Sequence, residues 1–168
     1  LLSILPLVDE LVVAVGDSTD DSRDIVASLH PTKIKIIDTV WDENLRKGGI
    51  ILAQQTDIAL KACSGDWCVY IQGDEVLHEK YLETVRSAIY MHHSNPEVEG
   101  LLFRYKHFYG SYDFIGGARK WYRQEIRVVR NHIAGLHSHK DAQGFRIYDR
   151  KLKVKWVDAE IYHYGWCR

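Results

Sequence analysis

The sequence contains few cysteines, no long apolar run and no low-complexity segment, and each absence excludes a class of protein. The three cysteines, Cys63, Cys68 and Cys167, are odd in number and lack metal-site spacing, which favours reduced thiols in a cytoplasmic protein over a disulfide scaffold. No apolar stretch approaches the roughly 20 residues that span a bilayer. The start of the chain has no recognisable signal peptide. We therefore expect an ordinary globular domain, for which 168 residues provide a sizeable core.

Charge is nearly balanced overall, at −1, but it is unevenly distributed. Acidic residues predominate in residues 1–100 and basic residues in residues 101–155. This asymmetry is typical either of solvated strand faces or of an anionic partner near the second half. A net charge near zero and the absence of a recognised motif argue against nucleic-acid binding.

The hydrophobic pattern predicts an α/β fold. Up to residue 96, strands alternate with helices, which favours a doubly wound, mostly parallel sheet. After residue 96 the pattern is β-rich with short connections. We expect a single domain over residues 1–168. The predicted elements are a strand at 11–15, a helix capped by Ser18 and Asp21, a strand at 33–38, a helix at 50–62, a strand at 67–71, a loop at 72–76 and a helix at 79–91.

Carboxylates follow two of the predicted strands. Asp17 follows the first, and Asp74 and Glu75 follow the strand at 67–71. Ligands of open parallel sheets bind beyond the carboxyl ends of the strands. Carboxylates there suit Mg²⁺ or Mn²⁺, which would in turn hold a diphosphate. The alternative is that Asp74 and Glu75 only begin the next helix, where negative charge favours the helix dipole.

Four segments together resemble a family 2 glycosyltransferase with the GT-A fold. They are "DELVVAVGDSTDDSRDIV", "GGIILAQQTDIALKACSGDWCVYIQGDEVLHEKYL", "EIRVVRN" with the His-containing loop after it, and "IYHYGW". The likeness covers most of the chain. It implies a fragment clipped at both ends that lacks the first strand, with a nucleotide-sugar half at 1–96 and an acceptor half at 97–168.

The resemblance implies an inverting hexosyltransferase that uses a UDP- or GDP-sugar and a divalent cation, Mg²⁺ or Mn²⁺. It implies a glycan or lipid-linked acceptor in cell-envelope biogenesis, and a cytoplasmic protein with peripheral membrane association. Carried over by position, Asp74, Glu75 and His163 are the expected metal residues, and Glu75 is also expected to support the loop. Asp17 and Ser18 would face the nucleotide, and Asp74 its phosphates. Separately from the resemblance, Arg46 lies next to Gly48 and Gly49 and either reaches a phosphate or is an exposed loop charge.

Two positions depart from the family pattern. Gln72 replaces the first acid of the DxD-type motif, and Val15 and Gly16 stand where an acidic residue often ends the second strand. Since a neutral amide is a weaker cation ligand than a carboxylate, Gln72 favours the alternative of a non-catalytic nucleotide-sugar-binding protein. A nucleotidyltransferase on a similar sheet is a further alternative.

An inverting transfer requires a general base for the acceptor hydroxyl. Asp141, in the loop "GLHSHKDAQGF", is the first candidate, followed by Glu125 and Asp113. His137 and His139 of that loop are either polar loop residues or, with His163, zinc ligands. An acceptor cleft is predicted from aromatic and basic residues that suit sugar faces and phosphate, or alternatively pack a core: Trp121, Tyr122, Arg123 and Arg127.

Overall fold

The computed structural model describes residues 1–117 and 121–167 and divides the chain into two compact units. The Asp74 unit comprises Leu1–Leu7, Val69–Arg130 and the residues from Lys153 onward. The Asp17 unit comprises Val8–Cys68 and Asn131–Leu152. Each unit contains segments from both sides of residue 96, so the assignment of a nucleotide half and an acceptor half stays a prediction.

The Asp17 unit contains two small sheets and the helix α2. Strands β1 (Leu11–Val15) and β2 (Ile34–Asp38) pair in parallel. Helix α2 (Ile50–Ala62) packs against β1 and against β7 (Leu136–His139). Strand β7 pairs with β8 (Gly144–Ile147), which pairs with β9 (Arg150–Lys151), both antiparallel. The predicted strand 11–15 and helix 50–62 are confirmed residue for residue.

Helix α1 (Ser22–Leu29) begins later than the sequence predicted. The expected capping pair of Ser18 and Asp21 does not form. Instead, Asp20 Oδ1 accepts hydrogen bonds from Ser18 Oγ at 2.7 Å and from the Ser22 N–H at 2.9 Å. These hydrogen bonds from Ser22 and Ser18 lower the pKa of Asp20 to about 2. The prediction was wrong because Asp20 is better placed to accept from both residues.

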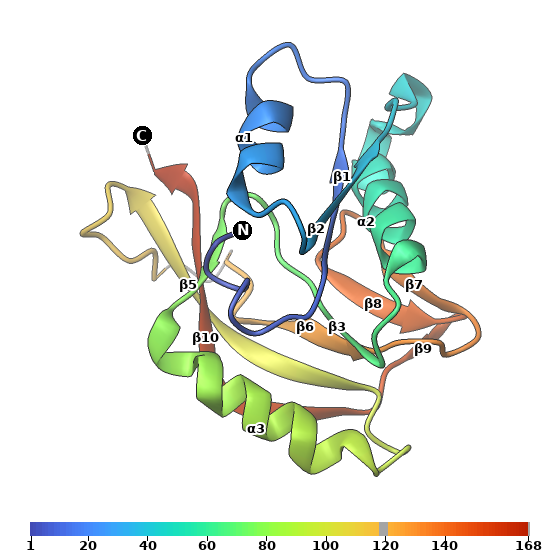
Figure 1. Cartoon of the computed structure of the whole chain (residues 1–168). Helices are drawn as coiled ribbons and strands as arrows, with labels where there is room; N and C mark the ends of the chain where they lie inside the picture. Colours follow the sequence, from blue (N-terminus) through green and yellow to red (C-terminus); the bar gives the residue numbers. More distant parts are fainter. Residues whose placement is uncertain (118–120, 168) are drawn as a thin grey trace. The chain divides into compact units, whose positions relative to one another are not determined.

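A five-stranded sheet in the order β3-β6-β5-β10-β4 lies mostly in the Asp74 unit, and its strand β3 begins in the last residues of Val8–Cys68. Figure 1 labels β3, β5, β6 and β10 of this sheet. Strand β5 (Gly100–Gly110) pairs in parallel with β10 (Val154–Cys167) and antiparallel with β6 (Gln124–Arg130). Strand β4 (Glu75–Leu77) pairs antiparallel with β10, and β3 (Trp67–Val69) lies beside β6. Helix α3 (Leu82–His93) packs on β10 and buries Val85 completely. Among the described helices, none is long and apolar enough to span a membrane.

The structure confirms the α/β class and the β-rich second half, but not a mostly parallel sheet. The larger sheet is mixed, because the long strands after residue 96 pair with neighbours in both directions. The predicted loop at 72–76 is also wrong in part. Glu75 and Val76 belong to β4, and a short 3-10 turn at Glu79–Tyr81 precedes α3. Glu75 is therefore a strand residue, which explains its burial.

Arg130, at the end of β6, holds the C-terminal end of α3. Its guanidinium donates to the carbonyls of His92, His93 and Asn95 at 2.8, 3.0 and 2.9 Å, and to that of Val98 at 3.0 Å. The last carbonyls of a helix have no partner within the helix, so a side chain that satisfies them stabilises the helix end.

We expect Arg130→Met to lower the free energy of unfolding by about 2–3 kcal/mol, since hydrogen bonds from a charged donor contribute more than neutral ones. Arg130→Lys should recover only part, because one ammonium group cannot reach all four carbonyls. Urea unfolding measures both. Arg23→Met, which removes an exposed ion pair to Asp38, is the control. A loss for Arg130→Met no larger than the control's would contradict this role.

Candidate active site

A buried ion pair lies at the start of β4. Arg127 Nη2 donates to Glu75 Oε1 at 2.8 Å and Arg127 Nε donates to Oε2 at 3.1 Å, and both side chains are 0% exposed. The Tyr105 hydroxyl donates to Oε1 at 2.6 Å, and the Gln72 N–H donates to Oε2 at 3.1 Å. Each oxygen of Glu75 thus accepts two hydrogen bonds, which compensates for the desolvation of its charge.

Arg127 points inward because β6 carries an irregularity at this residue. Leu101 pairs with Val128 and Leu102 with Ile126, so Arg127 is an extra residue in β6. Its guanidinium lies 5.1 Å from the centroid of the Tyr105 ring.

The neighbouring charges and rings fix the ionisation of this cluster. Burial alone would lower the pKa of Arg127, but the charge and the hydrogen bonds of the Glu75 carboxylate hold it above its ordinary value. Burial raises the pKa of Tyr105. Arg127 is therefore a cation and Tyr105 a neutral donor. Arg127 is fully buried, so the prediction that it lines an acceptor cleft is wrong. The alternative interpretation, that it packs in the core, is the correct one for this residue.

Asp74 directly precedes Glu75 in the sequence but is far more exposed to solvent, with 44% of its side chain accessible. Its Oδ2 lies 3.3 Å from His163 Nε2. The hydrogen bond from His163 lowers the pKa of Asp74, against the opposing effect of burial. A second contact fixes the backbone, because the Tyr164 N–H donates to the Asp74 carbonyl at 2.9 Å. The structure thus brings together Asp74 and His163, which lie far apart in the sequence.

Gly165 lies against the same pair. A Cβ atom at this position would overlap Asp74 Oδ2 and would lie 3.0 Å from His163 Cε1 and Nε2. Only a residue without a side chain therefore leaves Asp74 and His163 as they are.

His163 continues into a second buried histidine. His107 on β5 and His163 on β10 are register partners, 3% and 7% exposed, and their Nδ1 atoms lie 3.1 Å apart. His107 Nε2 lies 2.7 Å from the carbonyl oxygen of Tyr122. Burial lowers the pKa of His107. Asp74, His163, His107 and the Tyr122 carbonyl therefore form a continuous polar chain.

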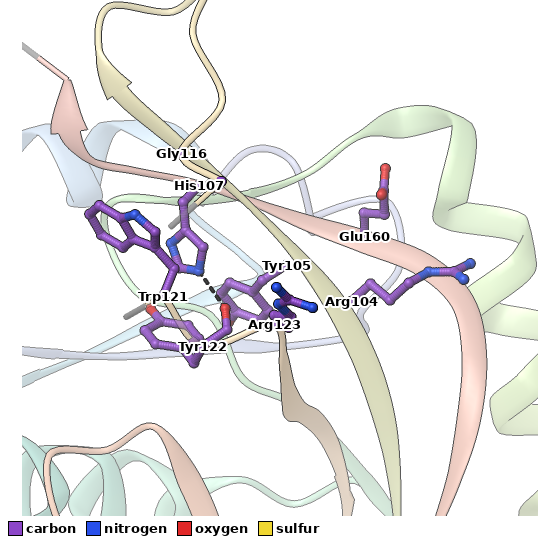
Figure 2. Close-up of a pocket in the computed structure, with 9 residues that line it drawn as sticks. Arg104, Tyr105, His107, Gly116, Trp121, Tyr122, Arg123 and Glu160 are labelled. Atoms are coloured by element: carbon purple, nitrogen blue, oxygen red, sulfur yellow. Dashed lines mark hydrogen bonds between the residues drawn. The ribbon is translucent and has the colours of Figure 1, made fainter. Parts of the chain in front are cut away.

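A pocket of about 330 Å³ lies beside His107 (Figure 2). The Trp121 ring stacks on His107 with centroids 5.1 Å apart, and the Tyr122 ring meets it edge-on at 4.5 Å. The pocket combines aromatic, cationic and anionic groups. Its lining residues are Arg104, Tyr105, His107, Gly116, Gly117, Trp121, Tyr122, Arg123 and Glu160. Of the predicted acceptor-cleft residues, Trp121, Tyr122 and Arg123 line it.

Two of the general-base candidates lie in the Asp74 unit. Glu125 on β6 pairs with Phe103 on β5. Its charge is one of several causes that raise the pKa of the Tyr122 hydroxyl; the largest is burial, and Glu75 and Asp74 also contribute. Asp113 is exposed in the turn after β5.

The remaining predicted site residues lie in the Asp17 unit. Asp17 and Ser18 are exposed in the turn after β1, and Arg46 is exposed between two short 3-10 turns before α2. Asp141 lies in the turn between β7 and β8, with its Cβ only 2.6 Å from where a Cβ of Gly49 would be. Their roles stay predictions.

The residues around Asp74 offer two side-chain ligands for the cation that the resemblance implies. Among the described residues no group of three or more His, Cys, Asp or Glu side chains could hold a metal ion. Asp74 and His163 do fit, since a carboxylate oxygen and an imidazole nitrogen lie side by side and the carboxylate is accessible. Glu75 does not offer a similar ligand, because Arg127, Tyr105 and Gln72 already occupy both oxygens.

Sequence reasoning missed His107. The sequence carries a histidine at the end of both "YKH" (105–107) and "IYH" (161–163). This likeness becomes informative only once β5 and β10 are known to pair in parallel, with His107 opposite His163.

Comparison with known families shows the family of this chain. The sequence profile of glycosyl transferase family 2 matches residues 1–154. The chain belongs to this family, and the protein is thus of the glycosyltransferase class. No match was found among curated proteins.

Proposed function

We propose that this protein transfers a hexosyl group, with inversion, from a UDP- or GDP-sugar to a glycan or lipid-linked acceptor, with the help of Mg²⁺ or Mn²⁺. The observation that supports this most directly is the pairing of Asp74 Oδ2 with His163 Nε2 at 3.3 Å. Both atoms are cation ligands, and they converge from the acidic motif and the late His-Tyr-Gly segment.

In this proposal Asp74 and His163 hold the cation. When bound, such a cation stabilises the charge of the departing nucleoside diphosphate. Glu75 supports the segment instead of binding the cation, because its ion pair with Arg127 anchors the residue next to Asp74. Gln72 Nε2 donates to the Tyr70 hydroxyl at 3.0 Å, and its backbone N–H serves Glu75. Gln72 is thus used structurally, and we do not count it as a ligand.

The same proposal assigns the nucleotide to the turn at Asp17 and Ser18, with Arg46 toward the phosphates. The candidates for the general base are three carboxylates. Glu125 lies on β6, Asp113 in the turn after β5 and Asp141 in the β7–β8 turn. A comparison of kcat for Glu125→Gln, Asp113→Asn and Asp141→Asn decides between them.

The acceptor is assigned to the pocket beside His107. Aromatic rings stack on sugar faces, and Trp121 and Tyr122 supply two of them. Arg104 and Arg123 supply cationic groups at the same pocket, which suits a phosphorylated or lipid-linked glycan. Such an acceptor in turn favours a cytoplasmic protein at the membrane surface, acting in cell-envelope biogenesis.

A second candidate function is nucleotide-sugar binding without transfer. The specific observation in its favour is Gln72, a neutral residue at the first position of the acidic motif. Donor hydrolysis separates the two candidates, because a binding module retains nucleotide affinity without turnover.

Isothermal calorimetry with UDP and GDP, with and without Mn²⁺, tests the proposed site. We expect binding that depends on Mn²⁺ and that weakens about tenfold or more in Asp74→Asn, the range typical of a damaged metal site. Glu83→Gln, which alters an exposed carboxylate on α3, is the matched control and should bind as the wild type does. Binding that is indifferent to Mn²⁺, or equal in Asp74→Asn and wild type, would overturn the assignment.

A further inference from the structure

Two buried imidazoles meet at a distance that requires one proton between them. The Nδ1 atoms of His107 and His163 are 3.1 Å apart. Two bare lone pairs would repel, and so would two N–H groups, so one Nδ1 donates and the other accepts. Which ring donates is decided by the outer ends of the chain.

The Tyr122 carbonyl decides the state of His107. A carbonyl oxygen can only accept, so His107 Nε2, 2.7 Å away, carries a hydrogen. A neutral imidazole with a hydrogen on Nε2 has a lone pair on Nδ1. His107 Nδ1 is therefore the acceptor, and His163 Nδ1 carries the hydrogen that is donated.

This assignment leaves the other nitrogen of His163 for a ligand. With the hydrogen on Nδ1, the lone pair of a neutral His163 is on Nε2. That nitrogen lies 3.3 Å from Asp74 Oδ2. Two electron-rich atoms so close need a positive species between them: either a proton on Nε2, which makes His163 a donor to Asp74, or a bound cation that takes the place of that proton.

We propose that His107 is a positioning residue that fixes the tautomer of His163 and thereby reserves His163 Nε2 for the cation. The inference deepens the proposed function and rests on it for the identity of the cation. Metal-binding histidines generally donate their second N–H to a fixed acceptor, which orients the ring and sets its tautomer. Here that acceptor is another imidazole, itself fixed by a backbone carbonyl.

The surroundings of His107 are rigid enough for this role. Trp121 stacks on one face of the ring and Tyr122 contacts it edge-on. Figure 2 shows His107 between these aromatic groups, with its hydrogen bond directed to the Tyr122 backbone. Because the ring cannot turn without losing these contacts, its Nδ1 stays directed at His163.

Nitrogen-15 NMR of the wild-type imidazoles in the metal-free, full-length protein tests the tautomer directly. At alkaline pH, where an imidazole is neutral, we expect the His163 signals of an Nδ1–H, Nε2-bare ring. A wild-type His163 with its hydrogen on Nε2 would overturn the role of His107. This measurement needs no variant and no transferase activity.

Calorimetry with Mn²⁺ alone tests the consequence for the cation. His107→Leu removes the acceptor, so we expect His163 to lose its fixed tautomer and Mn²⁺ affinity to fall about 10–100-fold. His107→Gln should retain most of the affinity, because its carbonyl can accept from His163 while its amide donates to Tyr122. His93→Leu, on the exposed end of α3, is the control.

The outcomes distinguish this inference from the proposed function. A folded His107→Leu with wild-type Mn²⁺ affinity, or a His107→Gln as weak as His107→Leu, would overturn the positioning role. A wild type that has the expected tautomer but binds no Mn²⁺ would instead overturn the proposed cation site. If His107→Leu fails to fold, the wild-type spectrum and His107→Gln still decide.

Discussion

Arg127→Met is expected to lower the free energy of unfolding by about 3–5 kcal/mol, the loss typical when one partner of a buried ion pair is removed. The reason is the state of Glu75, whose side chain is 0% exposed and whose two oxygens each receive one hydrogen bond from Arg127. Without the guanidinium, the carboxylate would remain buried beside Tyr105 with half of its hydrogen bonds. Urea unfolding of the full-length protein measures the loss.

The same substitution at an exposed position of the sheet provides the control. Arg104 on β5 pairs with Asp158, and these side chains are 55% and 87% exposed. Arg104→Met should change stability by about 1 kcal/mol or less, as is usual for a surface ion pair. The double variant Glu75→Gln with Arg127→Met should lose less than the sum of the two single losses, because no charge is then left unpaired. Additive losses, or an Arg127→Met as stable as Arg104→Met, would contradict the account of this pair.

Local patterns made part of the fold predictable. The apolar run Leu11–Val15 and the helical periodicity of Ile50–Ala62 each depend on neighbouring residues, and both elements were predicted with correct bounds. Strand β4 was missed because three residues are too few for a pattern. It exists through pairing with β10, at the other end of the chain.

The candidate site likewise contains residues that could be predicted from the sequence and residues whose roles depend on distant pairing. Asp74 was selected from its place after a predicted strand and also by resemblance, His163 by resemblance alone, and the structure places Asp74 Oδ2 3.3 Å from His163 Nε2. Glu75 was selected for the same metal, but its burial and its ion pair depend on β4 and on the irregularity in β6, neither of which is visible in the sequence. The role of His107 likewise depends on the register of β5 against β10.

Gly165→Ala is expected to lower kcat/KM for sugar transfer about a hundredfold, since small displacements of catalytic groups have effects of this size. The added methyl group would overlap Asp74 Oδ2 and press on the His163 ring, so these two side chains must separate. The backbone itself does not forbid alanine, because Gly165 is an exposed residue at an irregularity of strand β10 and is not among the residues with positive φ. The fold should therefore survive while the proposed cation site is displaced.

Gly73→Ala is the matched comparison for this glycine. Gly73 directly precedes Asp74, yet a Cβ at this position would meet nothing within 4 Å. We therefore expect Gly73→Ala to retain far more activity than Gly165→Ala, with thermal unfolding close to wild type in both. Equal activities of the two variants would show that displacing Asp74 and His163 has no effect on transfer. The proposal that these two residues form the centre of the site would then be wrong. A loss confined to Gly165→Ala, together with weaker Mn²⁺ binding, would link the His-Tyr-Gly segment to the acidic motif through one shared cation, because the atoms nearest to the added methyl group belong to Asp74 and His163.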